Sequence, residues 1–225
     1  MSRVLLVIVI ACTTGPVAAA ADDAYYLTLF TAEATPYRPE KTHTFLAITK
    51  VPKDGAAVEN REMSWLPATL KVRGVALRAE TGVNLSVADT LNVCRRDCMR
   101  VSVWGPYQIK PELYCRLSNQ IDRLGEGKIK YKGTDNLYPS PVAMNCYHAI
   151  WNVSHPMRKF VGPFTSGDAT GGKTVHLFRE WIICPETTHD DILKVVGVDQ
   201  EPLVRRSHDY WPSHAAAFRS FLGRY

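Results

Sequence analysis

The order of elements in this sequence predicts an α+β fold, with an antiparallel sheet packed against helices. A β-hairpin comes first, two amphipathic helices follow, and a third helix that begins at a cysteine precedes a late strand. A doubly wound fold would instead alternate strands and helices along the whole chain. At 225 residues, with 46% hydrophobic and 22% charged residues, the chain has the length and composition of one globular domain.

The predicted hairpin follows residues 24–40, which indicate irregular structure or a short strand. Residues 42–51 alternate and are rich in β-forming residues, which predicts a strand. The Asp-Gly pair at 54–55 is a strong hairpin signal, so residues 58–66 should return beside that strand. A further strand is expected over 70–77, where apolar residues recur.

Capping residues mark the predicted helices in the middle of the chain. Ser86 as N-cap, with Asp89 three residues later, predicts a helix over 84–101. Pro111 is placed to open a second helix, and Gly125 is placed to end it. The remaining expectations are a turn over 104–107, an edge strand over 128–132, a loop over 138–141, a helix from about 145 to about 155, a loop over 162–173, a strand over 174–183, and short helices over 192–196 and 214–222.

The N-terminus has the pattern of a secretory signal peptide. Arg3 precedes a short apolar run, and Ala19 and Ala21 match an A-x-A cleavage site, which predicts a secreted or periplasmic protein. Cys12 lies in a stretch similar to a lipobox, so a lipoprotein attached peripherally to a membrane is the alternative. The predicted organisation is a signal peptide over 1–21 and a single domain over 22–225, with its core over about 40–185 and a C-terminal extension over 186–225.

Charge and motif content argue against several kinds of partner. The formal net charge is +5 and the basic residues are scattered without a nucleic-acid-binding motif, so no nucleic-acid partner is predicted. No cofactor is predicted either. The pairs His189-Asp190 and His208-Asp209 leave a metal-dependent hydrolase as an alternative. Because no ligand cluster with metal-binding spacing accompanies them, no metal ligand is assigned.

The cysteine count favours one free thiol. Loss of the signal peptide removes Cys12 and leaves five of the six cysteines, an odd number for an exported chain. If Cys146 is free, two disulfides can form among the other four, whose pairing stays open: Cys94, Cys98, Cys115 and Cys184. The alternative is that all five are reduced and buried.

Cys146 is the candidate nucleophile and His43 the candidate base. Cys146 stands at the start of a predicted helix, where free N–H groups and the helix dipole stabilise a thiolate and the backbone N–H can serve an oxyanion. His43 shares one strand face with Phe45 and Ala47, and we expect that face to meet the cysteine helix. The alternatives are a buried core cysteine and a structural histidine.

Together these residues resemble the circularly permuted papain-like superfamily, which includes NlpC-like cell-wall peptidases and relatives of lecithin:retinol acyltransferase. In that group the histidine lies on the first core strand, and the cysteine follows in an Asn-Cys-x-His sequence at a helix start. The matching stretches here are His43-Thr44-Phe45-Leu46 and Asn145-Cys146-Tyr147-His148. The resemblance covers roughly residues 40 to 155. It implies a permuted papain-like fold with Cys146 as nucleophile and His43 as base.

The resemblance also implies an activity, that of a thiol hydrolase or acyltransferase that cleaves an amide bond of a cell-envelope peptide or a lipid ester. The group's third residue, which orients the histidine, usually comes from the next strand, where Glu62 and Ser64 are preferred. The absence of a second histidine there departs from the acyltransferase branch and weakens the lipid-ester interpretation. The alternative is an exported binding or structural domain of the same fold without activity.

Overall fold

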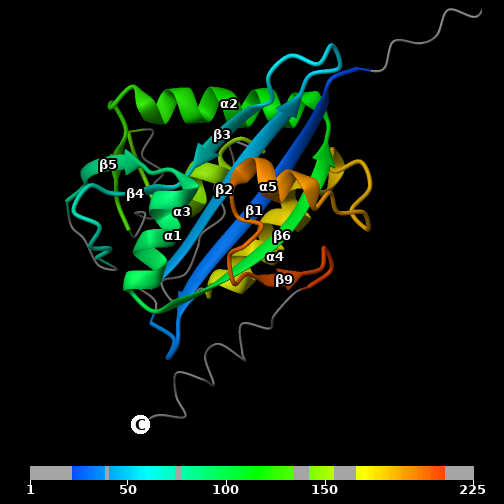
Figure 1. The fold of residues 1–225 in the computed structure, drawn as a ribbon. Coiled ribbons are helices and arrows are strands. Elements are labelled where there is room, and N and C mark those ends of the chain that lie inside the picture. The colour runs from blue at the N-terminus through cyan, green and yellow to red at the C-terminus, as the bar shows by residue number, and fades with distance from the viewer. Residues whose placement is uncertain (1–21, 39–40, 74–77, 134–141, 155–165, 211–225) are drawn as a thin grey trace, which may run out of the picture.

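The computed structural model describes residues 22–38, 41–73, 78–133, 142–154 and 166–210. These residues form a mixed α+β fold with two mixed sheets and five α-helices (Figure 1). The larger sheet, in the order β3-β2-β1-β6-β9, consists of Glu59–Met63, Thr42–Val51, Ala24–Ala34, Met99–Ile109 and Val204–Arg206. The smaller sheet, in the order β4-β5-β7-β8, consists of Trp65–Pro67, Glu80–Asn84, Lys130–Tyr131 and Ala143–Met144. The helices are α1 Val87–Arg96, α2 Pro111–Gly125, α3 Cys146–Trp151, α4 Gly167–Phe178 and α5 Asp191–Val196.

The larger sheet is antiparallel through four of its strands, as the sequence predicts. β1 pairs with both β2 and β6, and β2 pairs with β3, all in antiparallel register. The short strand β9 departs from the prediction, because it adds to β6 in parallel and makes the sheet mixed.

β1 is the central strand of this sheet, although the sequence indicates irregular structure or a short strand for residues 24–40. Its middle is buried on both faces, with Leu27 and Leu29 toward one core and Phe30 and Ala32 toward the other. β2 is covered on both faces as well, but it is followed by the Asp-Gly hairpin signal, which β1 lacks. β1 also precedes the range 40–185 that the sequence indicates as the core.

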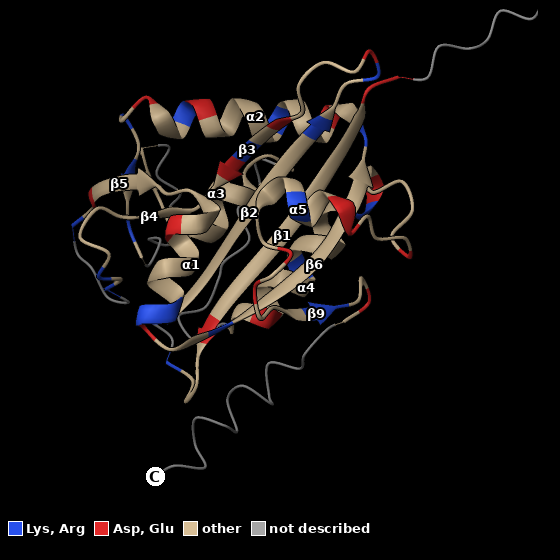
Figure 2. Cartoon of the chain, viewed as in Figure 1, with Lys and Arg blue, Asp and Glu red and all other residues tan. Residues whose placement is uncertain are grey.

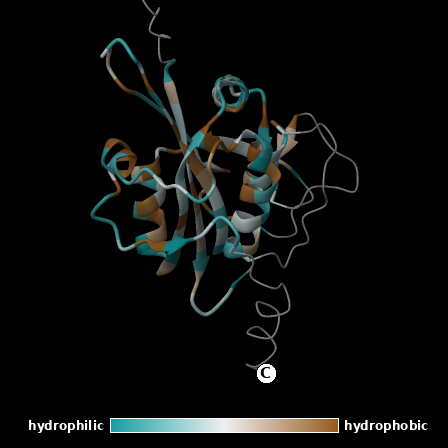
Figure 3. Cartoon of the chain, turned by 90° about the vertical axis from the view of Figure 1, so that its right-hand side faces the viewer, coloured by the Kyte–Doolittle hydropathy of each residue, from teal (hydrophilic) through white to brown (hydrophobic). Residues whose placement is uncertain are grey.

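Helices cover both faces of the larger sheet (Figures 1 and 3). On one face, Leu46 and Ile48 of β2 belong to a core completed by α2, α3, α4 and the smaller sheet. On the other face, Phe45 and Ala47 pack beneath α1 and α5. The middle of β1 and of β2 carries almost no charged residue, as Figure 2 shows. Because each face has a core of its own, the register of β2 fixes which helices each side chain meets.

Several predicted elements are confirmed. β2 spans residues 42–51, and the chain returns after the 54–55 turn as β3 and then β4. α2 begins at Pro111 and ends at Gly125, and α5 covers 191–196. α1 has Ser86 as its N-cap, with the Ser86 side chain accepting from the Asp89 N–H at 3.0 Å. The strand expected over 128–132 is present but shortened to β7, and the prediction that it is an edge strand is wrong, because β7 pairs on both sides, with β5 and β8.

The helix predicted over 84–101 is too long at both ends. Residue 84 belongs to β5, and residues 99–101 begin β6. The turn expected over 104–107 lies inside β6, where the register shifts between Leu27 and Leu29 of β1. Gly105 has a φ of 76°, so the Gly-Pro pair makes a bulge rather than ending the strand. Residues 70–73 do not form the expected strand.

The loop predicted over 162–173 is wrong from Gly167 onward, and the strand predicted over 174–183 is wrong, because α4 occupies Gly167–Phe178 and a 3-10 helix follows over Arg179–Trp181. Residues 162–165 lie outside the described residues. The glycines of α4 serve close packing against the sheet. A Cβ added at Gly171 would lie 2.4 Å from a ring atom of Trp104. Glycine-rich composition therefore indicates close contact here and not a loop.

A buried charge cluster anchors the start of α4. The carboxylate of Asp168 accepts from Arg100 of β6 at 2.9 Å and from Arg206 of β9 at 2.5 Å. Arg100 also pairs with Glu33 at the end of β1. The cluster ties α4 and the late strand β9 to the centre of the sheet, and no signal in the sequence pairs these residues.

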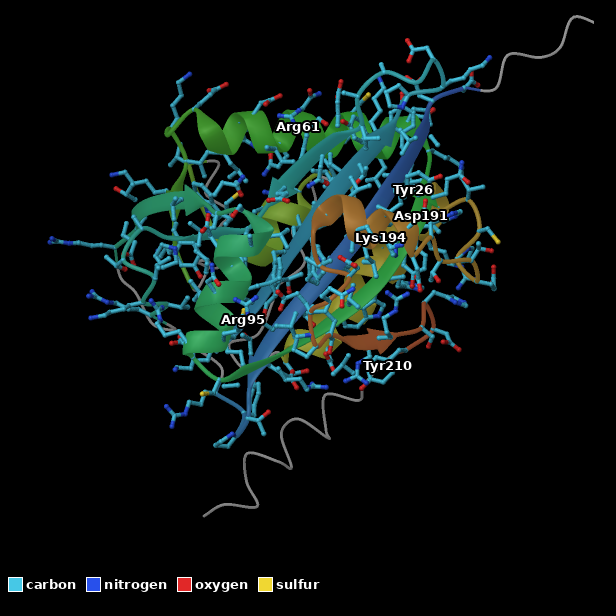
Figure 4. All side chains as sticks on the ribbon, viewed as in Figure 1. Tyr26, Arg61, Arg95, Asp191, Lys194 and Tyr210 are labelled. Carbon is cyan, nitrogen blue, oxygen red and sulfur yellow. The ribbon has the colours of Figure 1, made fainter. Side chains whose placement is uncertain are left out.

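Exposed ion pairs tie the outer helices to their neighbours. Arg61 of β3 pairs with Asp122 of α2, and Arg95 of α1 pairs with Glu201 before β9. Figure 4 labels the two arginines on their elements. Such surface pairs contribute at most about 1 kcal/mol each. Within the described ranges, no helix is both long enough and apolar enough to cross a bilayer. The predicted signal peptide, Cys12, the loop over 138–141 and the last helix over 214–222 lie outside the described residues.

Candidate functional site

Cys146 is the first residue of α3, as the sequence predicts. Asn145 is the N-cap, and its side-chain Oδ1 accepts from the His148 N–H at 2.9 Å. Asn145 also donates to the Gly133 carbonyl at 3.4 Å, which fixes the cap against the chain that leaves β7. Because the cap satisfies one free N–H of the first turn, the other first-turn N–H groups are left to the cysteine and its surroundings.

The Cys146 thiol meets β2 at the strand edge. The backbone N–H of Thr44 lies close enough to the sulfur to act against the rise in the pKa of the Cys146 thiol. On one side β2 pairs with β1, where Thr44 lies opposite Thr31, and on the other side its pairing with β3 begins only at Leu46. An N–H that reaches the thiol therefore points out of this open edge. The sulfur lies beside the residue that follows His43.

The His43 ring is held at one nitrogen. Its Nε2 lies 2.8 Å from the Oγ of Ser64, and the ring stacks on Phe45 with centroids 5.4 Å apart. Nδ1 is buried and has no hydrogen-bond partner among the described residues. The ring is thus oriented by the Nε2 contact and by stacking on Phe45, and Nδ1 is left without a hydrogen-bond partner among the described residues.

Ser64 is the residue at which the chain passes from the larger sheet to the smaller one, between β3 and β4. Its backbone is fixed on both sides, since its N–H donates to Asn84 at 2.7 Å and its carbonyl accepts from the Leu85 N–H at 3.0 Å. Its Oγ also lies 2.7 Å from the Oγ1 of Thr90 on α1. These contacts place the Ser64 hydroxyl against the His43 ring.

Glu62, the other residue predicted to orient the histidine, has different partners. Its two carboxylate oxygens accept from the Asn60 side chain and from the Val87 N–H, each at 2.8 Å. Val87 is the first residue of α1, so Glu62 caps that helix. The structure therefore brings Ser64 to His43 and places the Glu62 carboxylate on the helix beside it.

The face of β2 that carries His43 is not the face that α3 covers, so this expectation is wrong. Thr42 contacts the Tyr147 hydroxyl at 3.1 Å and Thr44 contacts Thr170 at 3.0 Å, which places α3 and α4 over the even-numbered face. His43 alternates to the face beneath α1. The cysteine reaches β2 at its edge, because β3 has already turned away there.

Burial dominates the protonation of both candidate residues. Cys146 and His43 are each 4% exposed. Burial raises the pKa of the Cys146 thiol to about 11, against hydrogen bonds from backbone N–H groups that include Thr44 and act in the opposite direction. Burial lowers the pKa of His43 to about 3. At neutral pH the resting site therefore contains a neutral thiol and a neutral imidazole.

The described cysteines are all free thiols. Cys94 and Cys146 are buried, and burial raises the pKa of Cys94 to about 12. Cys98, Cys115 and Cys184 are exposed. The structure thus gives no support to the two predicted disulfides, and the alternative of five reduced cysteines fits it only in part, since three are at the surface.

The described residues give little support to two other kinds of site, a phosphate-binding loop and a metal site. α4 contains Gly-Asp-Ala-Thr-Gly-Gly-Lys-Thr over 167–174, which matches the G-x4-G-K-T sequence of phosphate-binding loops. That sequence requires an open loop before a helix, whereas here the helix is continuous from Gly167 and Asp168 is buried in its ion cluster. The described ranges also contain no group of three or more histidine, cysteine or acidic side chains placed to hold a metal ion.

Comparison with protein-family models, with curated proteins and with solved structures finds no match to this chain. The resemblance to the permuted papain-like group therefore rests on its two short sequence motifs.

Three site residues carry no signal in the sequence. Asn84 and Thr90 reach Ser64 from segments 20 and 26 residues away. Thr44 acts through its backbone, which any residue would supply. Thr90 stands four residues after a predicted N-cap serine, which marks it as helical and not as a partner of Ser64.

Proposed function

We propose that this protein is a secreted thiol hydrolase or acyltransferase of the permuted papain-like kind, with Cys146 as nucleophile, His43 as base and Ser64 as the orienting residue. One observation carries the proposal. His43 is held at Nε2 by Ser64 and has no hydrogen-bond partner at Nδ1, and the backbone N–H of Thr44, the next residue along the strand, lies close to the Cys146 thiol. A Cys–His pair needs a histidine with one nitrogen oriented and the other available, and the nearness of Thr44 to the thiol supports placing His43 in that role.

The neutral resting pair supports general-base catalysis. In the proposed reaction, Nδ1 of His43 takes the thiol proton as the sulfur bonds to the carbonyl carbon of an amide or ester. The developing oxyanion faces the backbone N–H groups at the start of α3. The imidazolium returns its proton to the leaving amine or alcohol, and water or another acceptor then resolves the acyl-enzyme. His43 is unprotonated near neutral pH because burial lowers its pKa to about 3, and the step requires the bound substrate to offset the same burial, which makes the ring a weak base.

The proposed substrates are peptide amides of a cell envelope first and lipid esters second. The preference comes from the orienting position, where Ser64 stands in place of the second histidine of the acyltransferase branch. The proposed location is secreted or periplasmic, with the lipoprotein as its alternative.

Trapping of the acyl-enzyme tests the proposal. The protein is treated with a p-nitrophenyl ester at pH 7, quenched, digested and mapped by mass spectrometry. We expect one acyl group on Cys146, and none in Cys146→Ser. Cys115→Ser is the matched control, because it removes an exposed thiol and should leave the acyl group in place. Acylation confined to the exposed cysteines would reject the proposal.

A second candidate function is an exported binding or structural domain of the same fold without activity. The deep burial of Cys146 and His43 favours it, since burial opposes both the thiolate and the imidazolium. Under this candidate Cys146 stays unacylated while the fold is intact, which the same experiment detects.

A further inference from the structure

The His43 ring belongs to a short chain of hydroxyl groups that ends on a helix. His43 Nε2 lies 2.8 Å from Ser64 Oγ, and Ser64 Oγ lies 2.7 Å from Thr90 Oγ1. Thr90 Oγ1 in turn lies 2.7 Å from the carbonyl oxygen of Ser86, one turn earlier in α1. Ser64 is fully buried and Thr90 is 1% exposed, so the described contacts are the partners these hydroxyls have.

Counting protons assigns a direction to this chain. The three contacts have three protons to share, one each on Thr90, Ser64 and the neutral imidazole. Thr90 is positioned to donate to both Ser64 and Ser86, but it has a single proton, and the Ser86 carbonyl can only accept. If Thr90 donates to Ser86, Ser64 donates to Thr90, and His43 must donate from Nε2 to Ser64. Only this assignment gives every contact its own proton.

We propose that Thr90 is a positioning residue of the site, which acts through Ser64 to place the His43 proton on Nε2 and leave Nδ1 as the free base. The inference rests on the proposed function for its catalytic meaning, but its physical content is the tautomer of one ring. Without the Thr90 oxygen as acceptor, the Ser64 proton is released to His43 Nε2. The ring then carries its proton on Nδ1 and has no lone pair to offer the thiol.

The support of α1 fits this role. Glu62 caps the helix at Val87, and Ser86 forms its capping box with Asp89. Asn84 holds the backbone of both Glu62 and Ser64. Thr90 and Ser64 are thus parts of one hydrogen-bonded unit, which keeps the distance between their hydroxyls fixed.

Nitrogen-15 NMR of the histidine rings at pH 7 tests the proposal, with His43 assigned by comparison with His43→Gln. We expect the Nε2–H form in the wild type and a shift toward the Nδ1–H form in Thr90→Val. Thr90→Ser should restore the wild-type spectrum, because it restores the hydroxyl. We also expect Thr90→Val to slow acylation of Cys146 about tenfold, the cost of one misdirected hydrogen bond.

Thr174→Val is the matched control. Thr174 is fully buried and bonds the carbonyl four residues earlier in its helix at 2.7 Å, but its other partner is Trp151. An Nδ1–H ring in the wild type would overturn the proposal even if Thr90→Val failed to fold, and so would identical ring spectra in wild type and Thr90→Val. Acylation of Cys146 without the tautomer shift rejects only the role of Thr90. The tautomer shift without acylation rejects the thiol-hydrolase proposal instead.

Discussion

The hydroxyl of Ser64 lies 2.8 Å from Nε2 of His43, at the point where the chain crosses from one sheet to the other. Both residues are fixed by backbone hydrogen bonds. The pairing of β2 with β1 holds His43, and the hydrogen bonds to Asn84 and Leu85 hold Ser64. The His43 ring is therefore oriented through Nε2, and that orientation depends on one hydroxyl group.

Ser64→Ala should slow acylation of Cys146 by about tenfold to a hundredfold. The change leaves a buried ring nitrogen unpaired, which costs about 1–3 kcal/mol. The acylation rate with a p-nitrophenyl ester is the measurement. Ser102→Ala is the matched control, because Ser102 is also 1% exposed or less and its Oγ has no hydrogen-bond partner in the described structure. Equal acylation rates in Ser64→Ala and Ser102→Ala would show that Ser64 does not orient His43.

Glu62→Gln should lower the stability of the fold and leave the acylation rate almost unchanged. The carboxylate caps α1 and does not contact His43, so we expect the free energy of unfolding to fall by about 1 kcal/mol and the acylation rate to change less than twofold. Urea unfolding and the same kinetic assay measure the two effects. A loss of rate as large as that of Ser64→Ala would make Glu62 the orienting residue after all.

The burial of His43 predicts a pH dependence of stability. Its pKa is about 3 in the fold and 6.5 ordinarily, so between these values the unfolded chain binds a proton that the folded chain does not. Stability should therefore fall as pH decreases from 6.5 toward 3, by up to about 1.4 kcal/mol per unit from this group. Urea unfolding across that range should give a shallower decline for His43→Gln. Parallel declines would mean that the ring is protonated in the fold.

Gly171→Ala should destabilise the fold by about 1–3 kcal/mol, because the added Cβ would overlap the Trp104 ring. Gly125→Ala is the control, since Gly125 ends α2 and a Cβ there meets nothing within 4 Å. We expect this control to be neutral or slightly stabilising. Thermal unfolding compares the two, and an equally stable Gly171→Ala would contradict the close packing of α4.

Four elements could be predicted from signals that lie within a few residues of one another in the sequence. The alternation of β2, the capping box of α1, the proline that opens α2 and the asparagine cap of α3 all act within a few residues. The sequence could therefore place Cys146 at a helix start and His43 on a strand. Ser64 was within reach because the hairpin limits which residues return beside β2.

The rest depends on tertiary contacts. β1 is identified as the central strand only by the strands on either side of it, and α4 contains Gly171 and Gly167 where it packs against Trp104 and β1. The face that His43 presents was predicted, but not which helix would cover it, since α1 and α3 take opposite faces of one strand. The role of Thr90 arises from a contact across 26 residues.

The central claim is that His43 accepts the proton of the Cys146 thiol, and the pH profile of Cys146 acylation in wild type and His43→Ala tests it most directly. In the wild type we expect a nearly constant rate from about pH 5 to pH 8, because the base has a pKa of about 3 and is already neutral. In His43→Ala we expect at least a hundredfold lower rate at pH 7, rising tenfold per pH unit toward the thiol pKa of about 11. Equal rates and equal slopes in the two proteins would show that the sulfur reacts without the imidazole.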